Sequence, residues 1–157
     1  MKLIFSALIF CFLLAVSAFS QAAQKIDEFG GVPCDEYLGR MDAAVVQARD
    51  NPSATVYVLI YEGKESNYNS RKKKMEFGLT AYGSAEAKIR SIKNFLSKRK
   101  FPVERFSFVK AGFRESSMVE IWLVPSGDAP PKSTPTLAKM KYRKGKAVGF
   151  CTDCCGI

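Results

Sequence analysis

The chain has 157 residues, with 24 Lys and Arg against 15 Asp and Glu and no histidine, so its formal net charge is +9 at pH 7. This length suits one domain of ordinary size, and the basic excess favours anionic partners such as cell-wall polymers, lipid headgroups or nucleic acid. The lack of histidine excludes Ser-His-Asp and Cys-His nucleophile arrangements and removes the commonest transition-metal ligand, which argues against an enzyme.

Residues 1–22 have the pattern of a cleaved secretory signal peptide. Lys2 supplies a positive start, residues 3–18 form an apolar run without charge, and small residues then allow cleavage after Ser20 or Ala22. The run is short for a membrane span of about 20 residues, so cleavage is favoured over an uncleaved membrane anchor. We therefore expect an exported protein that is not integral to the membrane, with a formal charge of +8 once Lys2 is lost from the +9 total. Export makes nucleic acid the least favoured of the anionic partners.

Residues 23–125 are predicted to form one α/β domain, which begins with a strand, a helix and a second strand. Residues 25–29 are a candidate edge strand. Residues 34–50 place apolar side chains at helical spacing, with acidic residues in the first turn and Asn51-Pro52 as the stop. Residues 55–62, TVYVLIYE, are β-branched or aromatic on both faces, which indicates a central strand covered on both sides.

The densest charge of the chain follows in residues 64–74, KESNYNSRKKK, which are predicted to form a loop; residues 75–83 extend that loop or make a brief turn. The cations of this loop could bind an anion, and the aromatic side chains around it would suit stacking on a sugar or base. A solvated loop without a ligand is the competing interpretation, because charge runs are more often that. The residues concerned are Lys64, Arg71, Lys72, Lys73 and Lys74, with Tyr61, Tyr68, Phe77 and Tyr82 as aromatic neighbours.

Residues 83–125 are the best-determined stretch and read as a helix, a turn and two strands joined by a Gly-containing turn. In residues 84–98 the apolar side chains share one helical face, and the basic side chains are expected to face solvent. Residues 105–110 and 117–124 alternate from one face to the other as strands do. Trp122 lies on the second face of the last strand, where a second core layer is favoured over an exposed contact surface.

The predicted order is therefore (β)αβ, a loop and αββ, which is an α/β (α+β) two-layer sandwich of helices on a mixed sheet. Lys88, Arg90 and Lys93 of the second helix would lie beside the charged loop and join it in one positive patch, although exposed lysines on such a helix are commonplace. Residues 126–138 have the Pro and Ser content of an exposed linker, and residues 139–157 form a basic tail that carries three cysteines.

Four cysteines remain in the mature chain, Cys34 near the start and Cys151, Cys154 and Cys155 in the tail. In an oxidising compartment they predict disulfides, and a bond from Cys34 to Cys151 is favoured because it would hold the tail beside the first helix. Four thiolates could instead bind zinc, but a single C-x-x-C lacks the second, separated pair of a zinc ribbon. A thioredoxin-like redox role is weaker still, because the motif does not lie between a strand and a helix. No metal or cofactor is therefore assigned.

Several motifs of residues 25–125 occur in an order and spacing known from one family. They are the strand end VLIYEG at 58–63, the helix signature KIRSIKNFL at 88–96, the turn PVERF at 102–106, the strand end KAG at 110–112, the opening PCDE at 33–36 and the ending WLVP at 122–125. Together they resemble the OmpA-like C-terminal domain that binds peptidoglycan in Gram-negative envelopes, and its divergent exported relatives.

The resemblance implies a peptidoglycan site made of an Asp after the first full strand and an Arg at the start of the helix signature. This chain has Lys64-Glu65-Ser66 where the Asp is expected, and Lys88 at the arginine position. Lysine keeps the charge but lacks the bidentate fork of arginine. The fold can therefore persist while the site is lost.

The sequence thus favours a non-catalytic, exported binding module in the periplasm or cell envelope of a Gram-negative-type bacterium, associated with peptidoglycan or another anionic polymer. Two alternatives stay open. One is a scaffold that binds an envelope protein and has lost the peptidoglycan site, and the other is a small metal or redox protein that works through its terminal cysteines. No residue set supports an enzyme.

Overall fold

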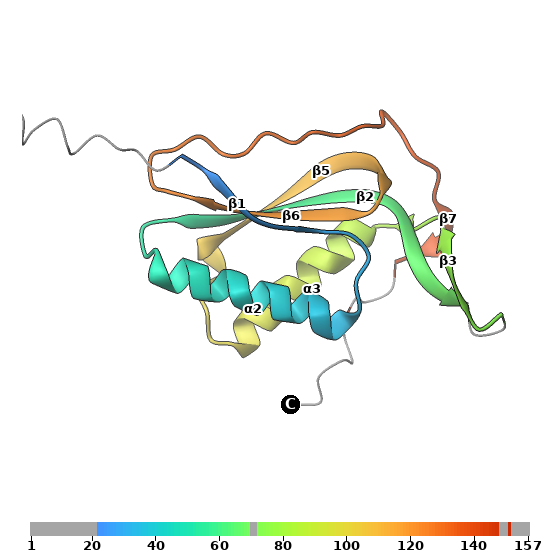
Figure 1. Cartoon of the computed structure of the whole chain (residues 1–157), viewed down its shortest axis with the longest axis horizontal. Coiled ribbons are helices and arrows are strands. Elements are labelled where there is room, and N and C mark those ends of the chain that lie inside the picture. The colour runs from blue at the N-terminus through green and yellow to red at the C-terminus, as the bar shows by residue number, and fades with distance from the viewer. Residues whose placement is uncertain (1–21, 70–71, 148–150, 152–157) are drawn as a thin grey trace, which may run out of the picture.

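A computed structural model of the chain describes residues 22–69, 72–147 and 151. The described chain has an α/β fold in which a mostly antiparallel sheet carries both helices on one face, and two short parallel strands form a second, small sheet (Figure 1). The α/β class and the order of the main elements are therefore confirmed.

The elements are β1 (Gln24–Phe29), α2 (Cys34–Asp50), β2 (Thr55–Asn69), β3 (Lys74–Gly78), β4 (Ala81–Tyr82), α3 (Ser84–Lys98), the 3₁₀ turn η2 (Val103–Arg105), β5 (Phe106–Ser116), β6 (Met118–Val124) and β7 (Arg143–Lys146). Both helices occupy the residues that the apolar spacing predicts. The edge strand expected near residue 25 is β1, which pairs only with β6 in the described sheet.

Strand β2 lies at the centre of the main sheet, between β6, which runs antiparallel to it, and β5, which runs parallel to it. Val56, Val58 and Ile60 are fully buried in the core that the helices cover. Leu59 and Tyr61 are fully buried on the opposite face. A strand with apolar side chains in both directions needs cover on both faces, and the prediction of a central, doubly covered strand is confirmed.

The face of the sheet away from the helices is covered in part by residues 125–142, which we call the C-terminal segment (Figure 1). The amide of Thr134 donates a hydrogen bond to the hydroxyl of Tyr61 over 3.0 Å, and the amides of Thr136 and Leu137 both donate to the carbonyl of Phe113. Residues with the composition of a linker thus lie against the sheet. Trp122 packs against the smaller apolar cluster on this face, as the sequence predicts.

The prediction of a loop over residues 64–74 is wrong. Strand β2 continues to Asn69 and forms an antiparallel hairpin with β3, from the pair Glu65–Gly78 to the pair Asn69–Lys74. Strand β5 likewise continues to Ser116 instead of ending near Gly112. Both extensions are held by backbone pairing of mostly polar residues, which gives little apolar alternation for a sequence pattern to reveal.

Gly63 stands where β2 crosses the turn between β5 and β6. It is buried, and a Cβ atom added there would overlap the backbone of Ser116 and Ser117. Backbone atoms cannot move aside as a flexible side chain can, so Gly63→Ala is expected to lower the free energy of unfolding by about 1–3 kcal/mol in urea titrations. The control is Gly39→Ala in α2, where an added Cβ atom would meet nothing within 4 Å beyond its chain neighbours and the helix's own backbone. It should stabilise the protein by about 0.5–1 kcal/mol, and equal stability of the two variants would contradict the close approach.

Candidate binding surface

The hairpin of β2 and β3 presents part of the charged run that the sequence singles out. Lys72, Lys73 and Lys74 are exposed, and the ammonium groups of Lys72 and Lys74 lie 3.0 and 3.5 Å from the carboxylate of Glu76. Arg71 lies outside the described residues. The hairpin therefore carries at least three solvent-facing cations, two of which lie close to the half-buried carboxylate of Glu76.

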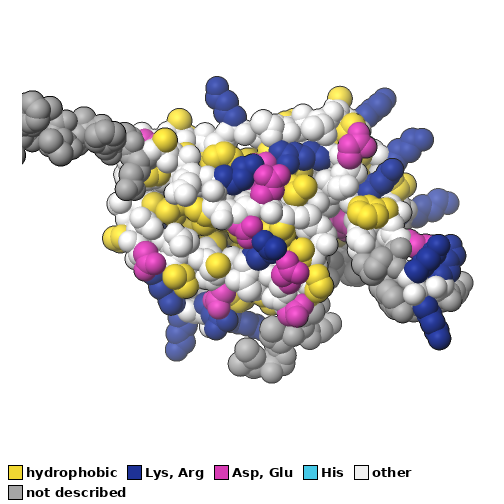
Figure 2. Space-filling view, viewed as in Figure 1, with side chains coloured by type: hydrophobic (Ala, Val, Ile, Leu, Met, Phe, Trp, Pro, Cys, Tyr) yellow, Lys and Arg dark blue, Asp and Glu magenta, His cyan; other side chains and the backbone are white. Residues whose placement is uncertain are grey.

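Strand β7 brings a second group of cations to the same end of the molecule. It pairs in parallel with β4, which follows β3 in the chain, and the amide of Arg143 donates to the carbonyl of Thr80 over 2.9 Å. Figure 2 shows Lys and Arg side chains projecting from this end. We define the basic end by its six exposed cations, which are Lys72, Lys73, Lys74, Arg143, Lys144 and Lys146.

The predicted contribution of helix α3 to this patch differs from residue to residue. Lys88 is only 6% exposed, so the expectation that it faces solvent is wrong. Arg90 and Lys93 are exposed. The ammonium group of Lys93 lies 5.6 Å from the ring centre of Phe108, in a part of the sheet about 20 Å along the strands from the start of the hairpin. Lys93 therefore belongs to a different part of the surface from the hairpin lysines.

Lys88 is buried because strand β2 and the turn between β5 and β6 supply oxygen atoms for its ammonium group. The group lies 2.8 Å from the carboxylate of Glu65 and donates to the hydroxyl of Ser117 over 2.6 Å. The second carboxylate oxygen of Glu65 accepts a hydrogen bond from the hydroxyl of Thr80 over 3.1 Å. A buried cation needs such partners, and here they tie α3 to the base of the hairpin and to the turn before β6.

Glu62 joins the helix, the sheet and the C-terminal segment. One carboxylate oxygen accepts hydrogen bonds from the hydroxyl of Ser84 over 2.8 Å and from the amide of Ala85 over 3.1 Å. This carboxylate caps α3 from outside the helix, because Gly83 at the N-cap has no side chain to do so and the helix N-terminus favours negative charge. The other oxygen accepts from the hydroxyl of Tyr142 over 2.6 Å, and burial together with this bond raises the pKa of Tyr142.

These two carboxylates explain how the basic end keeps its shape. Glu65 anchors the base of the hairpin, whereas Glu62 anchors the residue that precedes β7. The two groups of cations, about 70 residues apart in the chain, are therefore held by the same part of β2. The sequence predicts a basic tail but not its place beside the hairpin, since no local pattern signals a four-residue strand that pairs with a distant one.

The aromatic residues predicted around the loop fall into different environments. Tyr61 is buried, with the guanidinium carbon of Arg114 3.6 Å from its ring centre. The side chain of Tyr68 lies outside the described ones. Phe77 and Tyr82 are exposed at 69% and 66%, and Leu79, which the sequence analysis does not name, is exposed at 38%. The basic end thus also carries apolar side chains in contact with solvent.

A second charged cluster lies on the face of the sheet away from the helices, with Glu120 at its centre. Arg114 approaches its carboxylate to 2.7 Å and Lys25 to 3.4 Å, and the indole N–H of Trp122 donates to it over 3.1 Å. Burial opposes ionisation, but the hydrogen bonds from Trp122 and Arg114 and the two positive charges outweigh it and lower the pKa of Glu120. Arg114 also donates to the hydroxyl of Thr134 over 2.7 Å, so the cluster holds the C-terminal segment in place.

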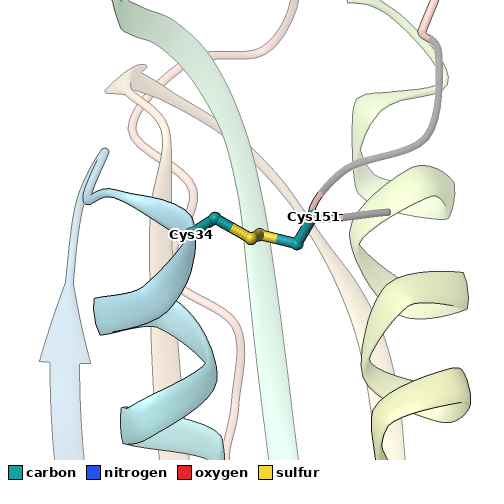
Figure 3. The surroundings of a disulfide bond; sticks show 2 residues. All are labelled: Cys34 and Cys151. Atoms are coloured by element: carbon teal, nitrogen blue, oxygen red, sulfur yellow. A yellow bond between two sulfur atoms is a disulfide. The ribbon is translucent and has the colours of Figure 1, made fainter. Parts of the chain in front are cut away.

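Cys34 and Cys151 lie at disulfide distance, with their Cα atoms 5.4 Å apart (Figure 3). This is the pairing that the sequence analysis favours. Cys154 and Cys155 lie outside the described residues. Within the described part of the chain, no group of three or more His, Cys, Asp or Glu side chains is placed to hold a metal ion, and no helix is long and apolar enough to cross a membrane.

The chain matches no protein-family model, no curated protein and no solved structure. A functional assignment therefore depends on the surface itself, and the basic end is its most distinctive part.

Proposed function

We propose that the protein is a non-catalytic, exported binding module of the cell envelope with OmpA-like architecture, and that its basic end associates with peptidoglycan or another anionic envelope polymer. The observation that carries the proposal is the assembly of two groups of cations, from the hairpin and from β7, on one rigid support. The signal-peptide pattern of residues 1–22 supports an envelope location.

The physical basis is the concentration of like charge at one end of the molecule. Cations held close together create a positive potential that attracts a polyanion at many points at once. Glu62 and Glu65 fix the supporting backbone before any ligand arrives, so less conformational freedom is lost on binding. Lys88, the position that the resemblance connects with the wall peptide, is buried and paired with Glu65. The proposal therefore uses the basic end and not the ligand site of the family.

The test is retention of the purified protein on isolated peptidoglycan sacculi at several salt concentrations. A hairpin variant with Lys72→Gln, Lys73→Gln and Lys74→Gln should bind on the order of tenfold more weakly at physiological salt, because three of the six cations are removed. A control variant removes three exposed lysines elsewhere, with Lys93→Gln and Lys98→Gln in α3 and Lys100→Gln just after it. It has the same net charge as the hairpin variant and should bind like the parent protein.

Specific association should survive moderate salt, whereas adsorption of a merely basic surface should not. Equal loss of binding in the two variants would show that net charge alone is responsible. No retention of the parent protein at low salt would remove the proposal.

A further inference from the structure

Exposed apolar side chains are concentrated at the basic end. Among the side chains that the structure describes, four large hydrophobic ones are exposed. Three of them, Phe77, Leu79 and Tyr82, lie in the six residues that run from the end of β3 to the end of β4. The fourth is Val46 in α2. Single exposed apolar residues are ordinary on a soluble protein, but three of them in one short segment next to the cations of the basic end indicate an interaction surface.

We infer that this segment docks on an anionic lipid bilayer, with Phe77, Leu79 and Tyr82 entering the boundary between headgroups and acyl chains while the cations of the basic end contact anionic headgroups. The inference relies on the proposed function for the view that the basic end is a binding surface, and it adds a lipid surface as a ligand.

The chemistry of the three side chains favours a bilayer over a polar polymer. Phe77 and Leu79 carry no polar atom, so they gain free energy only where hydrocarbon is available. Tyr82 combines an apolar ring with a hydroxyl group, which suits the membrane–water boundary. Its ring packs edge-on against that of Tyr142, with the centres 5.4 Å apart, and is still 66% exposed.

The surrounding charge complements an anionic leaflet. Each Lys or Arg close to such a surface strengthens binding by roughly fivefold, and the basic end has six of them. Glu76 is the carboxylate beside the hairpin lysines, and it is half-buried and paired with Lys72 and Lys74. Repulsion of anionic headgroups by this carboxylate is therefore reduced.

The backbone of the segment is fixed although its tips are exposed. Thr80 and Ala81 are buried at 2% exposure each, between Leu79 and Tyr82. The carbonyls of Thr80 and Tyr82 accept hydrogen bonds from the amides of Arg143 and Ala147 over 2.9 Å. The apolar side chains are thus presented on a support that needs no reordering on contact.

The experiment is co-sedimentation with vesicles of phosphatidylcholine alone and of phosphatidylcholine with about one-third phosphatidylglycerol. The parent protein should bind the anionic vesicles and not the neutral ones. A double variant, Phe77→Ser with Tyr82→Ser, should bind the anionic vesicles at least tenfold more weakly, because two apolar rings no longer enter the interface. Val46→Ser, which removes an exposed apolar side chain elsewhere, should bind like the parent protein.

The outcomes separate this inference from the proposed function. Vesicle binding that is unchanged in the double variant and lost at high salt would show electrostatic adsorption only and would overturn the inference. Retention on sacculi without vesicle binding would overturn it and leave the proposed function in place. Vesicle binding that needs Phe77 and Tyr82, without retention on sacculi, would support the inference and contradict peptidoglycan as a ligand of the basic end.

Discussion

Replacing Arg114 with methionine is expected to lower the free energy of unfolding by about 3–5 kcal/mol. The substitution removes the partner that lies 2.7 Å from the carboxylate of Glu120, whose side chain is only 4% exposed. It also removes the hydrogen bond to Thr134 and the contact with the ring of Tyr61. The carboxylate of Glu120 would stay buried without its nearest positive charge, which destabilises the folded state. Urea unfolding should measure the resulting decrease in the free energy of unfolding.

A matched control is Arg99→Met, which breaks an ion pair of similar length. Arg99 and Asp42 lie 2.9 Å apart, and their side chains are about half exposed, at 48% and 45%. Solvent screens that pair, so its loss should cost less than about 1 kcal/mol. The double variant Arg114→Met with Glu120→Gln should recover part of the stability, because no charge is then buried without its partner. Equal losses at positions 114 and 99 would contradict a special role for the buried cluster.

The cluster also predicts a pH dependence. The pKa of Glu120 is lower in the folded protein than its ordinary value, so its ionised form stabilises the fold. This contribution is complete above the pKa of the unfolded chain, about 4.3, and disappears as the pH falls through the lower pKa of the folded state. The difference in stability between the parent protein and the Arg114→Met variant should therefore be greatest near neutral pH and narrow below about pH 4.

Removing the Cys34–Cys151 pair should be at least as damaging. The two cysteines are separated by 117 residues, and a covalent link over such a distance restricts the unfolded chain strongly. In the chain-entropy model the variant Cys34→Ser with Cys151→Ser loses about 4–5 kcal/mol of unfolding free energy. Thermal and urea unfolding, with and without a thiol reductant, measure this loss, and the reductant should affect the parent protein but not the variant.

Serine at positions 154 and 155 provides the control for this prediction. That variant keeps Cys34 and Cys151 and should match the oxidised parent protein in stability. If it instead loses as much as the first variant, the stabilising bond involves other cysteines. If reductant changes neither protein, no disulfide contributes to stability.

Both helices and the central strand could be predicted from the sequence because burial imposes a period on apolar residues. Residues 34–50 and 84–98 keep one apolar face over four turns, and Val56, Val58 and Ile60 alternate with Leu59 and Tyr61. Periodicity reports which residues are buried, and it therefore locates elements that contribute to a core. The same reasoning explains the correct placement of Trp122 in the second layer.

The features missed by the sequence analysis depend on contacts between distant residues. Lys88 lies three residues after Ala85 and four before Ile92, so its spacing places it beside the buried face and only its charge suggests exposure. The partners that allow its burial lie 23 and 29 residues away in the chain. Strand β7 is polar throughout and the hairpin is largely polar, with Phe77 exposed instead of buried, so pairing of their backbones leaves none of the apolar alternation that burial imposes. Only the hairpin cations of the basic end could be predicted from the sequence. The cations of β7 are brought there by the parallel pairing of residues 81–82 with residues 143–146.

The position of β7 in the chain has a consequence for how the protein matures. Its cations come after every other described strand in the order of synthesis, and Cys151 follows only a few residues later. Until residues 142–146 are in place, β4 lacks its pairing with β7 and Glu62 lacks its hydrogen bond from Tyr142. A disulfide to Cys34 persists only in an oxidising compartment. In the exported protein that we propose, the basic end would therefore be completed late, once the last described residues have been delivered to the compartment in which the disulfide persists.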